Sequence, residues 1–199
     1  MKPRIKHISI LLLLGAAALF LWRLLDHKLD WQEEVELSDG RKITIEQKRI
    51  YFENHGTTES WVKFSLPEMQ GENTWHSYLT PMRIDVDNGQ VYVFGRPRGP
   101  KQVAYYLYPK VCIVAFAWRN AGFERVPLSA VPMRLLQEEN VYPCVPKHRG
   151  GTLTIVEKKQ QWCPPAGDGS LLVKRIDLKA YANACDSMAS LDGATRRSD

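Results

Sequence analysis

The chain has 199 residues, and its net charge of +5 and pI near 9 at first suggest a nucleic-acid-binding protein. The charge is concentrated, however, because residues 1–28 carry five basic and one acidic side chain, whereas the other 171 residues carry 22 basic and 21 acidic ones. A nearly neutral main part excludes the extended basic face that nucleic-acid binding needs. It is large enough for one ordinary domain with a substantial core.

The N-terminal region predicts a membrane anchor. No side chain between Ile8 and Trp22 is charged, and the apolar stretch reaches Leu25 if Arg23 is included. A helix over Ile8–Leu25 would be roughly 27 Å long, close to the hydrocarbon thickness of a bilayer, and Arg23 would reach the interface. The small-residue site Ala16–Ala18 lies inside the apolar run, which favours an uncleaved anchor over the alternative, a cleaved export signal.

The flanking charges predict the orientation of this anchor. Basic residues dominate residues 1–7, and acidic residues dominate the segment after the apolar run. The positive flank stays in the cytoplasm, so the chain after about residue 26 is expected to be exported. We expect a cytoplasmic flank (1–7), a transmembrane helix (8–25), a tether (26–33), a β-rich domain (34–186) and a flexible tail (187–199).

Alternating apolar and polar residues predict two β-hairpins, one over 34–46 that turns at Asp39-Gly40 and one over 83–95 that turns at 87–89. Residues 67–80 are expected to form a polar loop. Strands are predicted at 60–66, 103–107, 111–118, 123–128, 152–157 and 171–176, and short helices at 129–140 and 177–188. The fold class is therefore mainly β (α+β): one antiparallel sandwich or curved sheet with one or two marginal helices.

Four cysteines in an exported domain favour disulfides, with three arrangements to choose from. Cys144 and Cys163 both lie beside prolines in loop-like segments, so we favour a Cys144–Cys163 bond. Cys112 lies in an apolar run and is expected to be a small buried residue. The spacing of cysteines and histidines does not suit zinc.

No catalytic, cofactor-binding or metal-binding residue is predicted. The sequence lacks the motifs of serine hydrolases, phosphate-binding loops, dinucleotide-binding folds and zinc proteases. Asp85–Gly89 resembles a calcium loop, but its glycine is the fifth residue and not the sixth, which favours a turn. A nucleophile pair of Cys163 with His76 or His148 would compete with the disulfide.

Two further features have alternative interpretations. Seven aromatic residues between Tyr92 and Trp118 favour a sheet core, and an aromatic groove for a peptide or glycan is the alternative. Tyr105 and Tyr106 are neighbours, so we expect them to point in opposite directions. The basic clusters 96–101 and 147–149 are typical of solvated loops, and a phosphate or lipid-headgroup contact is the alternative.

Two patches, "WQEEVELSDGRKITIE" and "AWRNAGFERVPLSAVP", carry a resemblance. There the chain resembles small single-pass membrane proteins of proteobacteria with no assigned function. The shared pattern is an apolar N-terminal helix, an L-S-D-G-R hairpin and a later R-V-P-L-x-x-x-P turn. The resemblance implies a bacterial, envelope-anchored β domain and carries over no catalytic residue.

Together these observations predict a single-pass protein of the bacterial inner membrane whose C-terminal domain lies in the periplasm. Its expected role is non-enzymatic, as a domain that binds an envelope protein or helps to assemble a complex. The alternatives are a periplasmic thiol-dependent or hydrolytic enzyme and a membrane-anchored protein that neutralises a toxin. The expected partners are the lipid bilayer and an envelope protein, without nucleic acid or cofactor.

Overall fold

The computed structural model describes residues 28–52, 56–147, 150–160 and 176–196. Within these ranges, no helix is long and apolar enough to cross a membrane. The predicted span Ile8–Leu25 lies outside them, so it stays a prediction.

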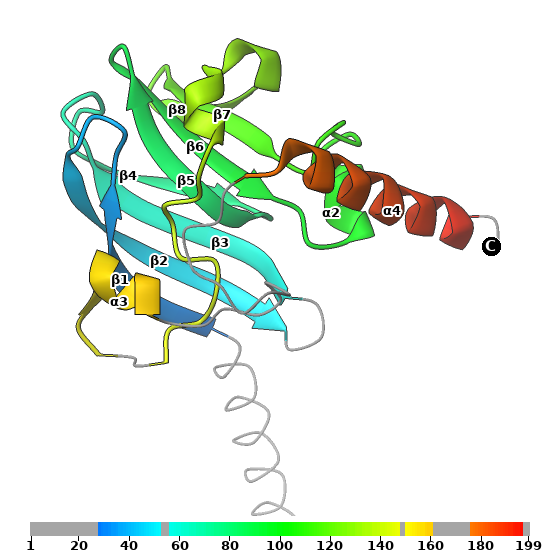
Figure 1. Cartoon of the computed structure of the whole chain (residues 1–199), viewed down its shortest axis with the longest axis horizontal. Coiled ribbons are helices and arrows are strands. Elements are labelled where there is room, and N and C mark those ends of the chain that lie inside the picture. Colours follow the sequence, from blue (N-terminus) through cyan, green and yellow to red (C-terminus); the bar gives the residue numbers. More distant parts are fainter. Residues whose placement is uncertain (1–27, 53–55, 148–149, 161–175, 197–199) are drawn as a thin grey trace, which may run out of the picture.

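The described chain is mainly β and forms two sheets (Figure 1). The five-stranded sheet has the order β4-β3-β2-β1-β9, and the four-stranded sheet has the order β5-β6-β7-β8. All neighbours are antiparallel except β1 and β9. The strands are β1 (Lys28–Glu36), β2 (Lys42–Phe52), β3 (Gly56–Ser65), β4 (Glu72–Ser77), β5 (Thr80–Asp87), β6 (Gln90–Arg96), β7 (Val114–Arg119), β8 (Gly122–Val126) and β9 (Thr152–Leu153).

Both predicted hairpins are confirmed, and their turn chemistry explains them. Between β1 and β2, Gly40 has a φ of 84°, and the Leu37 amide donates to the carbonyl oxygen of Arg41 at 2.8 Å. Between β5 and β6, Asn88 and Gly89 both have positive φ. Asparagine and glycine tolerate this left-handed region better than other residues, and the register of each hairpin follows from the turn.

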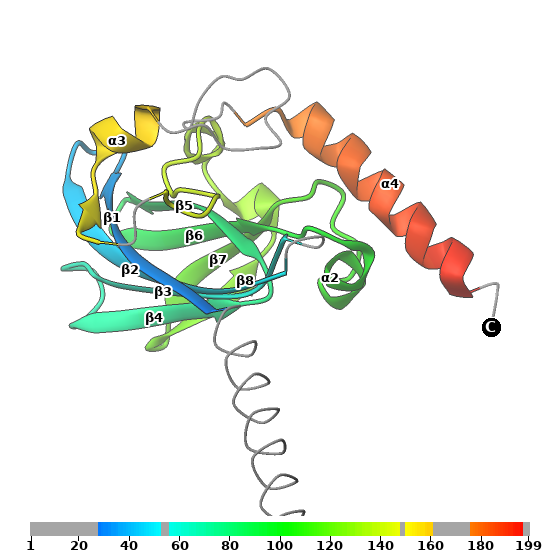
Figure 2. The ribbon, with the colours of Figure 1, turned by 90° about the horizontal axis from the view of Figure 1, so that it is seen from below.

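The two sheets pack face to face around the principal core (Figure 2). Val35, Val62 and Trp75 of the five-stranded sheet share this core with Ile84 and Phe116 of the four-stranded sheet. A second core covers the opposite face of the four-stranded sheet with residues of segment 128–136 and of the chain from Ile176 onward. Among the described residues, the four-stranded sheet is therefore covered on both faces, and the five-stranded sheet on one.

Two segments of the predicted organisation are corrected at the five-stranded sheet. β1 begins at Lys28, so residues 28–33 belong to a strand and not to a tether. Glu33 is buried although it is charged, so it interrupts the apolar alternation from which a strand is predicted. The predicted loop 67–80 contains β4, where only Trp75 is a large buried apolar residue.

Two other predictions are wrong because prolines override the apolar pattern. Residues 103–107, predicted as a strand, contain the end of helix α2 (Pro100–Tyr105), which has Pro100 in its first turn. The predicted helix 129–140 is two short 3₁₀ helices, η1 (Leu128–Ala130) and η2 (Met133–Leu136), because Pro132 separates them.

The predicted strand 152–157 is also corrected, since it stops after two residues. Helix α3 (Ile155–Gln160) follows, and Thr154 and Glu157 cap its start reciprocally. The Thr154 amide donates to Glu157 Oε2 at 2.8 Å, and the Glu157 amide donates to Thr154 Oγ1 at 3.2 Å. This is a capping box, which begins a helix even within a β-branched run. The predicted strand 171–176 lies outside the described residues except for Ile176.

The predicted C-terminal helix is confirmed as α4 (Leu178–Arg196), and it is longer than expected. The predicted tail 187–199 is therefore helical as far as Arg196. A disulfide joins Cys112 to Cys185 with a Cα–Cα distance of 5.1 Å. Cys112 is thus buried, as expected, but it is a bridge that holds α4 and not an inert apolar residue.

At Gly95 the two sheets approach each other so closely that there is no room for a side chain. A Cβ atom at this position would lie 2.7 Å from Cβ of Leu79 and 3.1 Å from the Trp75 ring. We expect Gly95→Ala to lower the free energy of unfolding by about 1–3 kcal/mol, the usual cost of overpacking. Gly122→Ala is the matched control, since its nearest contact would be 4.0 Å away. Equal urea midpoints for the two variants would contradict the packing described here.

Candidate functional site

The outer face of the five-stranded sheet is the sheet face left uncovered in the described part of the chain. Outward side chains of β1, β2, β3 and β4 lie in cross-strand rows, because the strands are paired in register. The first row is Asp30, Lys48, Trp61 and His76, and the second is Gln32, Glu46, Lys63 and Thr74.

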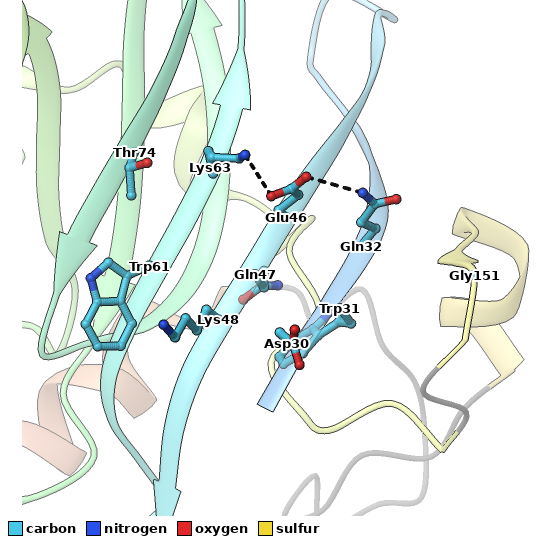
Figure 3. Close-up of a pocket in the computed structure, with 10 residues that line it drawn as sticks. All are labelled: Asp30, Trp31, Gln32, Glu46, Gln47, Lys48, Trp61, Lys63, Thr74 and Gly151. Atoms are coloured by element: carbon cyan, nitrogen blue, oxygen red, sulfur yellow. Dashed lines mark hydrogen bonds and ion pairs between the residues drawn. The ribbon is translucent and has the colours of Figure 1, made fainter. Parts of the chain in front are cut away.

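A hollow of about 620 Å³ lies over these two rows (Figure 3). Polar and charged residues dominate its lining, and the Trp61 indole of β3 stands among them. Two acidic and two basic residues balance each other in charge. The lining residues are Asp30, Trp31, Gln32, Glu46, Gln47, Lys48, Trp61, Lys63, Thr74 and Gly151.

Trp61 is held between the side chains that flank it in the first row. The His76 ring stacks on it with centroids 4.8 Å apart and planes 9° apart, and Lys48 Nζ lies 5.4 Å from its centroid. His76 in turn pairs with Glu59 at 2.7 Å. Trp61 therefore stands upright on the sheet with a fixed orientation, as a preformed contact residue does.

The second row is an ion-pair chain across three strands. Lys63 Nζ lies 3.0 Å from Glu46 and 3.1 Å from Glu72, and Gln32 Nε2 donates to Glu46 at 3.3 Å. The hydrogen bond from Lys63 lowers the pKa of Glu46, and Glu46 and Glu72 raise the pKa of Lys63. These charges are exposed and compensate one another, so each pair contributes little to stability.

Directly beneath this face lies a buried polar cluster, which the sequence analysis did not identify. Arg49 donates to Gln47 Oε1 at 2.8 Å, to the Tyr142 carbonyl at 2.6 Å and to the Pro143 carbonyl at 2.8 Å. Its guanidinium also lies 4.9 Å from the Trp31 ring centroid. Burial lowers the pKa of Arg49, so these contacts are needed to stabilise the charged form.

Glu33 is the anion of this cluster. Both of its carboxylate oxygens accept the Tyr142 amide at 3.0 Å, and Gln47 donates to it as well. Lys158 Nζ lies 3.4 Å from Glu33 and donates to the Asn140 carbonyl at 2.7 Å. Burial lowers the pKa of Lys158, and the Glu33 carboxylate opposes that shift. The buried charges are therefore matched by each other and by backbone groups.

Arg49, Glu33 and Lys158 all bond to residues 138–143, which we call the crossing segment because it bonds to both sheets. Its Asn140 side chain accepts the Ile84 amide at 3.0 Å and donates to the Glu36 and Ile84 carbonyls at 2.9 and 2.8 Å. Its Glu139 accepts the Tyr181 hydroxyl at 2.6 Å. The cluster is thus a structural clamp.

Of the candidate site residues of the sequence, the described part of the chain contains His76 and Cys144. His76 lies on the outer face beside Trp61, and Cys144 lies just after the crossing segment; no described cysteine is a free thiol. Cys163 and His148 lie outside the described residues, so the Cys144–Cys163 bond stays a prediction. Within the described ranges, no group of three or more His, Cys, Asp or Glu side chains could hold a metal ion.

Arg49→Lys tests the clamp. A lysine keeps the charge but cannot reproduce the guanidinium fork, so we expect the free energy of unfolding to fall by about 3–5 kcal/mol, as when a buried charge loses its partners. Chemical denaturation measures this change. Lys48→Arg, one residue away on the exposed face, should change it by less than about 0.5 kcal/mol. A tolerated Arg49→Lys would show that the crossing segment is held by other contacts.

Comparison with protein-family models, with curated proteins and with solved structures finds no match to this chain.

Proposed function

We propose that this protein is a membrane-anchored, non-enzymatic binding domain of the bacterial envelope, which receives a protein partner on the outer face of its five-stranded sheet. The observation that carries the proposal is the hollow over β1 to β4, with Trp61 held upright between Lys48 and His76. The predicted anchor at Ile8–Leu25 supports the location, and the flanking charges support a periplasmic domain.

The chemistry of the face favours a protein over a small substrate. Tryptophan is enriched among the residues that dominate protein–protein binding energies, and such residues lie near the centre of an interface. Around Trp61, the alternating charges of Lys48, Glu46 and Lys63 suit a partner surface of complementary mixed charge. The hollow is open to solvent, unlike the clefts that enclose most of the surface of a small molecule.

The edge of this sheet strengthens the same interpretation. In the described chain, β4 pairs with β3 on one side and has no strand on the other. Its Thr74 borders the hollow, so a partner that covers Trp61 would also reach the β4 edge. An extended segment of the partner would add hydrogen bonds to that edge, a common mode of peptide recognition.

Site-specific photocrosslinking in the native host tests the proposal. We replace Thr74 with benzoylphenylalanine in the full-length chain and expect a covalent adduct with one envelope protein of reproducible mass. A second change, Trp61→Ala, should lower the adduct yield about tenfold or more, because loss of a central interface tryptophan costs about 2 kcal/mol or more.

Two controls make this result specific. The same crosslinker at Lys159, an exposed residue of α3, should not give the Thr74 adduct. Met133→Ala, an exposed change outside this face, should leave the yield at Thr74 unchanged. If Thr74 and Lys159 give the same adducts, or if Trp61→Ala folds normally and has no effect, the outer face is not the binding surface.

A further inference from the structure

Four large apolar or aromatic side chains are exposed together beside helix α2, and we call them the aromatic end. Tyr78, Tyr105, Leu107 and Tyr108 are 39%, 63%, 77% and 42% exposed. The rings of Tyr78 and Tyr105 are in edge contact, with centroids 5.0 Å apart. A cluster of exposed large apolar groups on one surface marks a contact site more often than isolated ones do.

The aromatic end is held rigidly from the inside. Val103 and Tyr106, which alternate with the exposed residues, are buried, and the Tyr106 hydroxyl accepts the Tyr78 amide at 3.2 Å. The Cys112–Cys185 disulfide fixes the following segment to α4. Helix α2 and helix α4 lie side by side (Figure 2).

The backbone at the tip of this segment is strained in a way that keeps its side chains outward. Leu107 and Tyr108 have φ of 56° and 50°, a left-handed conformation that costs non-glycine residues about 1–2 kcal/mol each. Their amides are nevertheless satisfied, by the carbonyls of Ala104 and Val103 at 2.9 Å. The exposed Leu107 therefore destabilises the folded chain in two ways, through its backbone strain and through the contact of its apolar side chain with water. A surface that covers Leu107 would remove the second cost.

The register places the aromatic end at the end of the molecule where the chain enters the sheet. Lys28, the first residue of β1, pairs with Ile50, and Ile50 pairs with Glu59. Ser60 pairs with Ser77, so Tyr78 lies one residue further, at the level of Glu59 and Lys28. Three strand spacings, about 14 Å, separate Lys28 from Tyr78 across this end.

The distance to the predicted anchor is short. Only two residues separate Leu25, the end of the predicted span, from Lys28, so the connection extends over at most about 11 Å. The end of the sheet that holds Lys28 must then face the bilayer closely. The aromatic end lies on that same level.

The charge around the aromatic end suits phospholipid headgroups. Glu59, which lies level with Tyr78, is paired with His76. Residues 96–113 contain four basic side chains, of which Arg96 pairs with Glu139. Two of them, Lys101 and Lys110, flank the exposed cluster and are themselves exposed. Tyrosine is enriched at membrane interfaces, and apolar insertion combined with basic residues is how surface-bound segments hold anionic bilayers.

We propose that the aromatic end is a second membrane contact, which inserts Leu107 and Tyr105 into the headgroup region of a bilayer containing anionic phospholipid. This inference rests on the proposed anchoring of the chain. The contact fixes the tilt of the domain, because a single tether at Lys28 leaves rotation about the anchor free, whereas a second contact beside Tyr78, about 14 Å from Lys28, does not.

Lipid photocrosslinking of the full-length chain tests this second contact. The chain is reconstituted in nanodiscs of phosphatidylethanolamine and phosphatidylglycerol, with Leu107→benzoylphenylalanine, and its mass is measured after illumination. Met133→benzoylphenylalanine is the matched control. Met133 is 62% exposed, and its neighbour Arg134 pairs with Asp87, at the end of β5 opposite Tyr78. We expect a lipid adduct when the crosslinker replaces Leu107 and none when it replaces Met133.

The outcomes separate this inference from the proposed anchoring. If the chain elutes with the nanodiscs but Leu107 gives no more lipid adduct than Met133, the second contact is wrong and the anchor stands. If the chain does not elute with the nanodiscs, the anchor fails, and the inference falls with it. Tyr105→benzoylphenylalanine repeats the test at a second exposed position, and urea midpoints like that of the parent chain show that each variant is folded.

Discussion

The buried guanidinium of Arg49 imposes the constraint on which the rest of the structure depends. Arg49 is only 2% exposed, and a charged group at such a position is stable only if its donors find acceptors. Two of those acceptors are backbone carbonyls of Tyr142 and Pro143, more than 90 residues away in sequence. The crossing segment must therefore lie against β2 for the fold to form. Once it does, Asn140 and Glu139 bring β5 and α4 into place as well, so one buried cation couples both sheets and the C-terminal helix.

This constraint also explains which parts of the fold the sequence predicts. The two hairpins follow from local chemistry, since Asp39-Gly40 and Asn88-Gly89 determine turn and register together. Glu33 and Arg49 have no such local signature, because their acceptors and donors come from a distant loop. The disulfide shows the same limit: Cys112 and Cys185 are 73 residues apart, and only the packing of α4 beside α2 brings them together.

The candidate face could be predicted in part. The alternation in Ser60–Leu66 directs Val62 and Phe64 inward, so Trp61 and Lys63 had to lie on the other face of the strand. What the sequence could not show is that the described residues leave this face uncovered, because coverage depends on where the crossing segment and α4 pack. The position of His76 on this face was not predicted for a different reason. β4 has a single large inward residue, so its sequence is typical of a loop, although the strand pairs regularly with β3.

The two ends of the sandwich differ in chemistry, and this difference connects the two proposals. At the hairpin end, polar groups are paired, as where Asp85 binds the Ser38 amide and hydroxyl at 3.0 and 2.6 Å. At the opposite end, Lys28 enters the sheet and the aromatic end is exposed. A bilayer that contacts both Lys28 and Tyr105 leaves the strands standing away from the lipid. In the proposed arrangement, the outer face around Trp61 points sideways from the bilayer and is accessible to a partner, whereas a domain lying flat on that face would bury it. Under the two proposals, membrane contact at one end is what keeps the proposed binding face open.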